Sequence, residues 1–121
     1  MYRLEKRFRF EASHQLPLHD GKCKRLHGHS WVGLLVVEGQ SLQQDGPQAG
    51  MLVDYASLSA SVDWLVECSL DHWHLNDSTR LENPTSEELA RWIYNRVKPM
   101  VPLLVEVQIE ETCTAKAVYR P

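Results

Sequence analysis

Residues 2–12 alternate between apolar and charged side chains, and this pattern restricts the fold more than any other feature of the sequence. Even positions are apolar apart from Lys6, and every odd position from 3 to 11 is Arg or Glu. Because successive side chains of a β-strand point to opposite faces, the pattern predicts a strand with one face on a hydrophobic core and the other in solvent. His14 continues the apolar parity, so we expect this imidazole to lie close to buried surface.

The remaining periodicities predict an α+β fold. Apolar side chains gather in strand-like patterns over residues 27–38, 103–110 and 115–120. Asp54 is a suitable N-cap for a first helix, and Thr85 with Glu88 forms a capping box for a second. The order strand, strand, helix, helix, strand, strand indicates one domain over residues 1–121, a four-stranded antiparallel sheet with both helices on one face.

Composition and charge exclude several classes of protein. With 121 residues, 43% hydrophobic and 24% charged, the chain has the composition of an ordinary globular domain. Its formal net charge of −3 gives no support for a nucleic-acid partner, and no apolar run approaches the roughly 20 residues of a membrane helix. No signal peptide is visible, and three cysteines without C-x-x-C spacing fit a reducing compartment, so we expect a cytoplasmic protein.

The edges of the predicted sheet bear on assembly. Exposed edges are usually blunted or paired with another chain. Pairing between subunits would close a barrel of several chains whose lumen carries the charged face of residues 3–11. A monomer would leave that face in solvent, and the residues alone favour neither arrangement.

Three histidines form a candidate metal site. His27 and His29 are separated by one glycine, so in a strand both imidazoles point to the same face, and the glycine allows a backbone or a ligand to approach closely. His14 is the obvious third ligand, and three protein ligands with an open fourth position are typical of catalytic zinc. Cys23 as a fourth ligand would instead close the site and make it structural, and His19 is a weaker candidate ligand.

Other residues have catalytic potential outside this pattern. Cys23 has three basic neighbours that favour a thiolate, although a cysteine in a solvated basic loop fits the same sequence. Asp71 precedes His72, and a carboxylate can orient an imidazole that activates a thiol, although adjacent residues need not bond and His74 competes for the role. Glu111 continues the parity expected to face the core (positions 103 to 109), so it needs a partner there unless a bulge turns it to solvent.

Together these residues resemble the 6-pyruvoyl-tetrahydropterin synthase superfamily. The similarity spans nearly the whole chain and rests on five motifs: Glu11-Ala12-Ser13-His14, Cys23-x-x-x-His27-Gly28-His29, Leu70-Asp71-His72, Asn83-Pro84-Thr85-Ser86-Glu87 and Glu111-Thr112-Cys113-Thr114. The closest branch is the bacterial 6-carboxy-5,6,7,8-tetrahydropterin synthases of queuosine biosynthesis. In that branch three residues separate the cysteine from the histidine pair, as here, whereas the pyruvoyl-forming enzymes typically have two more.

The resemblance implies a tunnelling fold, in which three chains close a barrel and two trimers stack into a homohexamer with sites at subunit interfaces. It also implies that His14, His27 and His29 bind Zn²⁺. The substrate would be 7,8-dihydroneopterin triphosphate, and a zinc-dependent lyase reaction would give 6-carboxy-5,6,7,8-tetrahydropterin, acetaldehyde and triphosphate.

The same resemblance implies the remaining catalytic residues. Cys23 would accept a proton with assistance from Asp71 and His72, and Glu111 would anchor the pterin ring. Lys22, Lys24 and Arg25 either meet the triphosphate or form a solvated loop. The alternatives are a 6-pyruvoyl-tetrahydropterin synthase or related pterin side-chain lyase and, from another class, a non-catalytic structural zinc protein.

Overall fold

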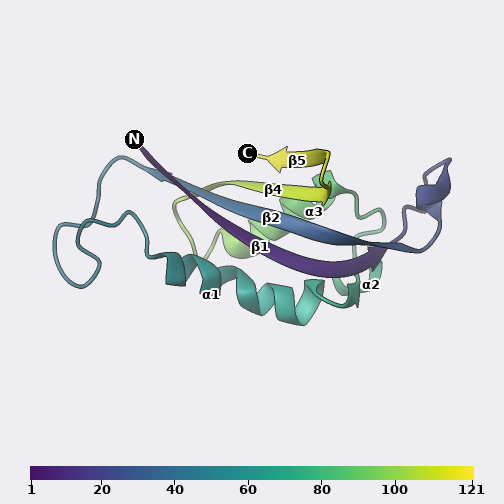
Figure 1. The fold of residues 1–121 in the computed structure, drawn as a ribbon, viewed down its shortest axis with the longest axis horizontal. Coiled ribbons are helices and arrows are strands. Elements are labelled where there is room, and N and C mark those ends of the chain that lie inside the picture. Colours follow the sequence, from purple (N-terminus) through teal and green to yellow (C-terminus); the bar gives the residue numbers. More distant parts are fainter.

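A twisted five-stranded sheet forms the centre of the computed structural model, which describes residues 1–121 (Figure 1). β1 (Tyr2–His14) pairs antiparallel with β2 (His27–Gly39), β2 with β4 (Leu104–Thr112), and β4 with β5 (Ala115–Tyr119). The predicted α+β class and the four main strands are confirmed. The sheet is not purely antiparallel, however, because the two-residue β3 (Trp73–His74) runs parallel to the end of β1.

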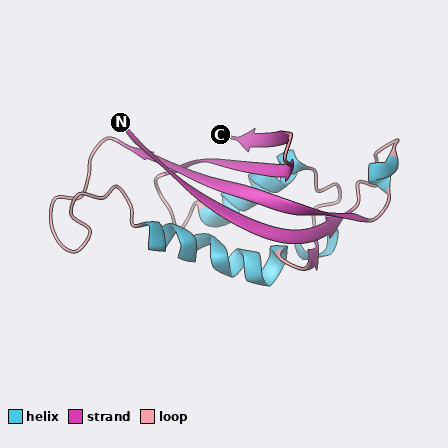
Figure 2. Cartoon of the chain, viewed as in Figure 1, coloured by secondary structure: helices cyan, strands magenta, loops and turns pink.

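The two long helices, α1 (Tyr55–Leu65) and α3 (Ser86–Val97), lie on one face of the sheet, as the sequence predicts (Figure 2). None of the helices is long and apolar enough to cross a membrane. In chain order the helical segments are the 3₁₀ turn η1 (Lys22–Lys24), α1, the π-helical turn η2 (Val66–Leu70), α2 (Leu75–Ser78) and α3.

Both predicted helix caps are present. The Asp54 carboxylate accepts a hydrogen bond from the N–H of Ala56 at 2.9 Å, at the start of α1. The Thr85 hydroxyl accepts one from the N–H of Glu88 at 3.2 Å, at the start of α3. Each cap satisfies one of the N–H groups that a helix leaves unpaired at its first turn, which fixes where the helix begins.

One hydrophobic core joins the sheet to the helices. Phe8, Phe10 and Trp31 contribute aromatic rings from β1 and β2, and the Phe10 and Trp31 rings stack with centroids 5.8 Å apart. Gly33 lies directly beneath Phe8, and a Cβ at position 33 would overlap that ring. Only glycine therefore allows the aromatic layer to lie flat on β2.

A β-bulge in β4 changes which of its side chains face the core. The register with β2 shifts where Val36 pairs with Glu106 and Val37 pairs with Leu104. Leu104 is fully buried and Leu103 is 37% exposed, so the prediction that Leu103 faces the core is wrong. The bulge adds one residue to β4, and every side chain on its N-terminal side changes face.

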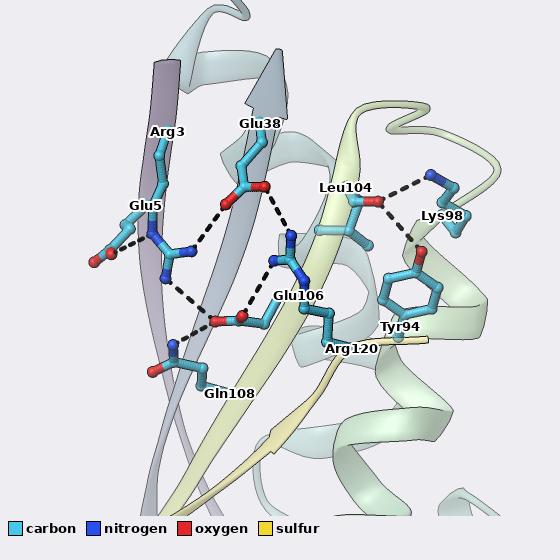
Figure 3. A network of polar contacts seen from close by, with 9 residues as sticks. All are labelled: Arg3, Glu5, Glu38, Tyr94, Lys98, Leu104, Glu106, Gln108 and Arg120. Atoms are coloured by element: carbon cyan, nitrogen blue, oxygen red, sulfur yellow. Dashed lines mark hydrogen bonds and ion pairs between the residues drawn. The ribbon is translucent and has the colours of Figure 1, made fainter. Parts of the chain in front are cut away.

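The outer face of the sheet carries a closed ring of ion pairs where β1 begins (Figure 3). Arg3 contacts Glu38 at 3.1 Å and Glu106 at 3.3 Å. Arg120, the residue after β5, contacts the same two carboxylates at 2.9 Å and 3.4 Å. Each guanidinium therefore bridges both carboxylates, and the ring joins β1, β2 and β4 to the end of β5.

Candidate metal centre

The three predicted histidines converge at the opposite end of the sheet, where β1 ends and β2 begins. His14 is paired with His27 across the two strands, and His29 lies two residues farther along β2. The ring centroids are 4.5 Å apart for His14 and His27, 4.9 Å for His27 and His29, and 5.1 Å for His14 and His29. Strand pairing thus brings His14 to two imidazoles that lie 13 and 15 residues farther along the chain.

Backbone carbonyls fix the orientation of two of these rings. His14 Nδ1 donates to the carbonyl of Pro84 at 2.9 Å, and His27 Nδ1 donates to the carbonyl of Arg25 at 2.6 Å. A carbonyl only accepts hydrogen bonds, so Nδ1 carries the proton and Nε2 presents a lone pair. The Nε2 atoms of all three histidines are buried and have no hydrogen-bond partner. Buried polar atoms are normally paired, and convergent imidazole lone pairs of this kind are what a metal ion requires.

Glu111 completes the cluster; the sequence predicted a partner for this carboxylate but not that the histidines would be that partner. Its Oε1 lies 3.1 Å from His14 Nε2 and 3.2 Å from His29 Nε2. Donor atoms bound tetrahedrally to one zinc ion lie about 3.4 Å apart, given bond lengths of about 2.0–2.2 Å. The four residues are therefore suited to hold a metal ion, with one atom from each within 4.8 Å of the others.

A second bulge in β4 lies at Glu111. The register with β5 shifts between Glu110, which pairs with Lys116, and Thr112, which pairs with Ala115. The Glu111 side chain remains 31% exposed while its carboxylate reaches the histidines. Sequence reasoning offered a bulge as a route to solvent for this side chain, but its carboxylate reaches the histidines despite the bulge.

The protonation state of the cluster also favours a metal. Burial lowers the pKa of His14 and of His29, and the neighbouring His27 lowers both further, while the Glu111 carboxylate has the opposite effect. Metals bind neutral imidazole, so burial keeps these rings in the form that coordinates.

Asp71 and His72 bond to each other, which their adjacency in sequence could not establish. His72 Nδ1 lies 2.9 Å from Asp71 Oδ2, and the N–H of Glu11 donates to Asp71 Oδ1 at 2.8 Å. These two contacts, that of Glu11 first, hold the pKa of the Asp71 carboxyl below its ordinary value. His72 has a φ of 62°, a strained conformation of the kind that is common in active sites. The competing imidazole, His74, bonds to Ser13 Oγ at 3.0 Å instead.

Two pockets flank the start of β2 and share Gly28, His29 and Ser30. A Cβ at position 28 would make only an ordinary contact at 3.5 Å with the carbonyl of Ala12, so packing within the chain does not require this glycine. The first pocket, of about 490 Å³, is also lined by Glu11, Ala12, Ser13, His72, Trp73 and His74. The second, of about 500 Å³, is also lined by Arg9, Val32, Glu110, Glu111, Thr112 and Cys113.

Cys23 lies apart from these groups. It is in η1, within the β1–β2 loop that extends beyond the end of the sheet in Figure 1. Its thiol is not part of the metal-binding cluster, and it lines neither pocket. Its basic neighbours Lys22, Lys24 and Arg25 line neither pocket either.

Known proteins of one family have similar sequences and the same fold. The family model for 6-pyruvoyl tetrahydropterin synthase matches residues 3–121, so the chain belongs to that family and is an enzyme. It is 48% identical over 120 residues to the 6-carboxy-5,6,7,8-tetrahydropterin synthase of Synechocystis sp., which covers 98% of this chain and 93% of that protein.

Two further proteins, one relative in sequence and one solved structure, are also similar to this chain. It is 33% identical over 93 residues to the dihydroneopterin monophosphate aldolase of Pyrococcus furiosus, covering 77% of this chain and 72% of that protein. The structure of Caenorhabditis elegans 6-pyruvoyl tetrahydropterin synthase superposes with a TM-score of 0.84 at 26% identity, covering 99% of this chain and 95% of that one. These matches confirm the family resemblance and the fold predicted from the sequence.

Proposed function

We propose that this enzyme is a zinc-dependent 6-carboxy-5,6,7,8-tetrahydropterin synthase. It would convert 7,8-dihydroneopterin triphosphate and one water into 6-carboxy-5,6,7,8-tetrahydropterin, acetaldehyde and triphosphate, in the cytoplasmic pathway to queuosine. The observation that carries the proposal is the convergence of three buried imidazole nitrogens without hydrogen-bond partners at one point, beside a pocket lined by His72, whose imidazole is paired with Asp71. The 48% identity to a relative of that name supports the choice of reaction.

In this proposal His14, His27 and His29 hold the zinc ion through Nε2. Zinc, when bound, supplies a Lewis acid that acidifies hydroxyl and carbon positions of the substrate side chain. The carbonyls of Pro84 and Arg25 keep the rings of His14 and His27 in the tautomer that this role needs.

Proton transfer is assigned to Cys23 and to the Asp71–His72 pair. The ionised Asp71 orients His72 through Nδ1, which leaves Nε2 of His72 free to exchange a proton inside the 490 Å³ pocket that also reaches His29. Cys23 is the proposed proton acceptor. Because Cys23 lines neither pocket of its own chain, the proposal assigns it to a site that a neighbouring subunit helps to form.

An oligomer is therefore part of the proposal, as a homohexamer made from two trimers. β3 pairs only with Ala12 and Ser13, so most of the outer edge of β1 is unpaired, and the outer edge of β5 is unpaired at the other side of the sheet. Two open edges on one sheet allow chains to pair in a ring. Sedimentation equilibrium would test the hexamer, and a monomeric mass would contradict it.

Glu111 is proposed to anchor the pterin ring. A carboxylate can accept two hydrogen bonds from the guanidine-like edge of a pterin. Glu111 faces both the histidines and the 500 Å³ pocket, so a ring held there would place its side chain beside the metal centre.

The strongest competing function is another pterin side-chain lyase. The 33% identity to a dihydroneopterin monophosphate aldolase favours it specifically. The structural zinc site built from three histidines and Cys23 is less well supported, since Cys23 is not a member of the cluster.

Product analysis tests the proposal. Zinc-loaded enzyme is incubated with 7,8-dihydroneopterin triphosphate, and acetaldehyde and 6-carboxy-5,6,7,8-tetrahydropterin are measured. Formation of both in equal amounts supports the function. A pyruvoyl product, or side-chain cleavage that releases no acetaldehyde, would assign the enzyme to the competing class.

A further inference from the structure

The triphosphate of the proposed substrate carries several negative charges, and the sequence suggested Lys22, Lys24 and Arg25 to meet them. None of these lines either pocket beside His29. Among all residues that line the two pockets, Arg9 is the only lysine or arginine. Guanidinium is the side chain best matched to phosphate, because its donors form a planar fork that binds two oxygens at once.

Arg9 is available for a ligand, in contrast to the arginine at the other end of the same strand. Both residues are exposed on the outer face of β1, yet Arg3 is paired with Glu5, Glu38 and Glu106. Arg9 forms no ion pair or side-chain hydrogen bond. Its charge is therefore not neutralised by any carboxylate of its own chain.

The position of Arg9 also matches the order of groups in the substrate. Arg9 is paired with Val32 on β2, and Val32 with Glu110 on β4, so the 500 Å³ pocket extends across three strands. Two strand spacings separate the Cα atoms of Arg9 and Glu110 by about 10 Å. Glu111 on β4, His29 on β2 and Arg9 on β1 thus follow the order of pterin ring, side-chain diol and triphosphate.

We propose that Arg9 binds the triphosphate of the substrate and determines the enzyme's preference for phosphorylated pterins. The inference rests on the proposed function, since it takes the metal centre and Glu111 as the sites of the diol and the ring. Glu110 opposes Arg9, because its carboxylate lines the same pocket and repels phosphate. The relative named for a dihydroneopterin monophosphate indicates that phosphate recognition differs within the family.

The test compares variants of the zinc-loaded enzyme with two ligands. Arg9→Ala should raise the KM for 7,8-dihydroneopterin triphosphate about tenfold, as expected for loss of a charge-assisted pair. Its Ki for phosphate-free 7,8-dihydroneopterin as a competitive inhibitor should not change. Arg7→Ala is the matched control, since Arg7 lies two residues away on the same face but lines neither pocket beside His29, and it should leave both constants unchanged. Glu110→Gln should lower the KM.

Calorimetric binding of inorganic tripolyphosphate separates this inference from the proposed function. If Arg9→Ala weakens tripolyphosphate binding while the unsubstituted enzyme releases no acetaldehyde, the reaction is wrong and the phosphate site stands. If the enzyme is active but Arg9→Ala leaves the KM within twofold, or if Arg7→Ala has the same effect as Arg9→Ala, the phosphate site is refuted. Equal weakening of both pterins by Arg9→Ala would also refute it, since Arg9 would then contact the ring.

Discussion

Polar side chains are paired with one another at one end of the β1–β2 strand pair and lack hydrogen-bond partners at the other end. Where β1 begins, Arg3, Glu38, Glu106 and Arg120 satisfy one another in a closed ring. Where β1 ends, three buried imidazole nitrogens have no partner. A ring of paired charges is complete within the chain and contributes to folding, whereas unpaired buried nitrogens are costly unless a ligand binds them. The contrast separates the end of the sheet that is complete within the chain from the end where we propose that the reaction takes place.

Carboxylates and imidazoles show the same contrast in their pKa values. Hydrogen bonds from Arg120 and Arg3 lower the pKa of Glu38. At Glu106 burial acts to raise the pKa, and the contacts with Gln108, Arg3 and Arg120 outweigh it, so the net shift is downward. In the histidine cluster burial itself is the main cause of the lowered pKa values. Partners stabilise charge at the first end, and burial removes it at the second.

The largest effect is expected from His27→Ala. It should remove zinc and reduce acetaldehyde production at least about 1000-fold, because the metal and its ligands act as one unit. The metal-free variant should lose little stability relative to the metal-free parent, since Nε2 of His27 has no hydrogen-bond partner and the only hydrogen bond lost, from Nδ1 to the Arg25 carbonyl, is exposed. Metal analysis, activity and chemical unfolding test the three parts, with His19→Ala in the β1–β2 loop as control. If the variant retained its full zinc content, His27 would not be a metal ligand, and the contrast between the two ends of the sheet would fail.

Cys23→Ala should come next, with turnover reduced by about 10²–10⁴-fold, the usual contribution of a general base. Zinc should remain bound, because the thiol is not part of the cluster. Cys68→Ala, at an exposed position, is the control. Loss of zinc together with activity would make Cys23 a ligand and the site structural.

Glu111→Gln should have an intermediate effect. The amide keeps the shape of the side chain but accepts poorly from the guanidine-like edge of a pterin, so the KM should rise about tenfold with zinc retained. Loss of zinc would instead show that this carboxylate ligates the metal, which its distances to His14 and His29 also allow. An unchanged KM with zinc retained would refute the anchoring role.

The smallest effect is expected from Glu106→Gln, at the other end of the sheet. It should lower the free energy of unfolding by about 1 kcal/mol at neutral pH, since it breaks one corner of a partly exposed network, and leave turnover unchanged. Because the pKa values of Glu106 and Glu38 are lowered in the folded chain, the ring contributes stability above the ordinary carboxyl value of 4.5 and loses it as the pH falls further. The difference between parent and variant should therefore shrink on acidification. If the difference in unfolding free energy between parent and variant stayed constant with pH, the stabilising role of the ion-pair ring would be contradicted.

The sequence was sufficient to predict what regular strand geometry determines. The alternation along residues 2–12 gave β1, its buried face and the burial of His14, because side-chain parity survives wherever pairing is regular. The spacing of His27 and His29 predicted their convergence for the same reason. Asp54 and Thr85 gave the helix starts because capping is a local interaction.

Tertiary interactions determined what the sequence could not supply. The first bulge in β4 breaks parity, which reversed the assignments of Leu103 and Leu104, and the contact of Glu111 with the histidines joins residues that are far apart in the sequence. β3 exists only through its pairing with Ala12 and Ser13, and two residues carry no periodicity of their own. The separation of Cys23 from both pockets depends on the path of a loop, for which residue spacing gives no rule.

X-ray absorption spectroscopy at the zinc edge of the purified enzyme tests the central claim most directly. We expect one zinc per chain, with nitrogen and oxygen neighbours at about 2.0–2.2 Å and at least two imidazole scattering patterns. Sulfur at about 2.3 Å would place Cys23 on the metal and contradict a catalytic centre built from His14, His27 and His29.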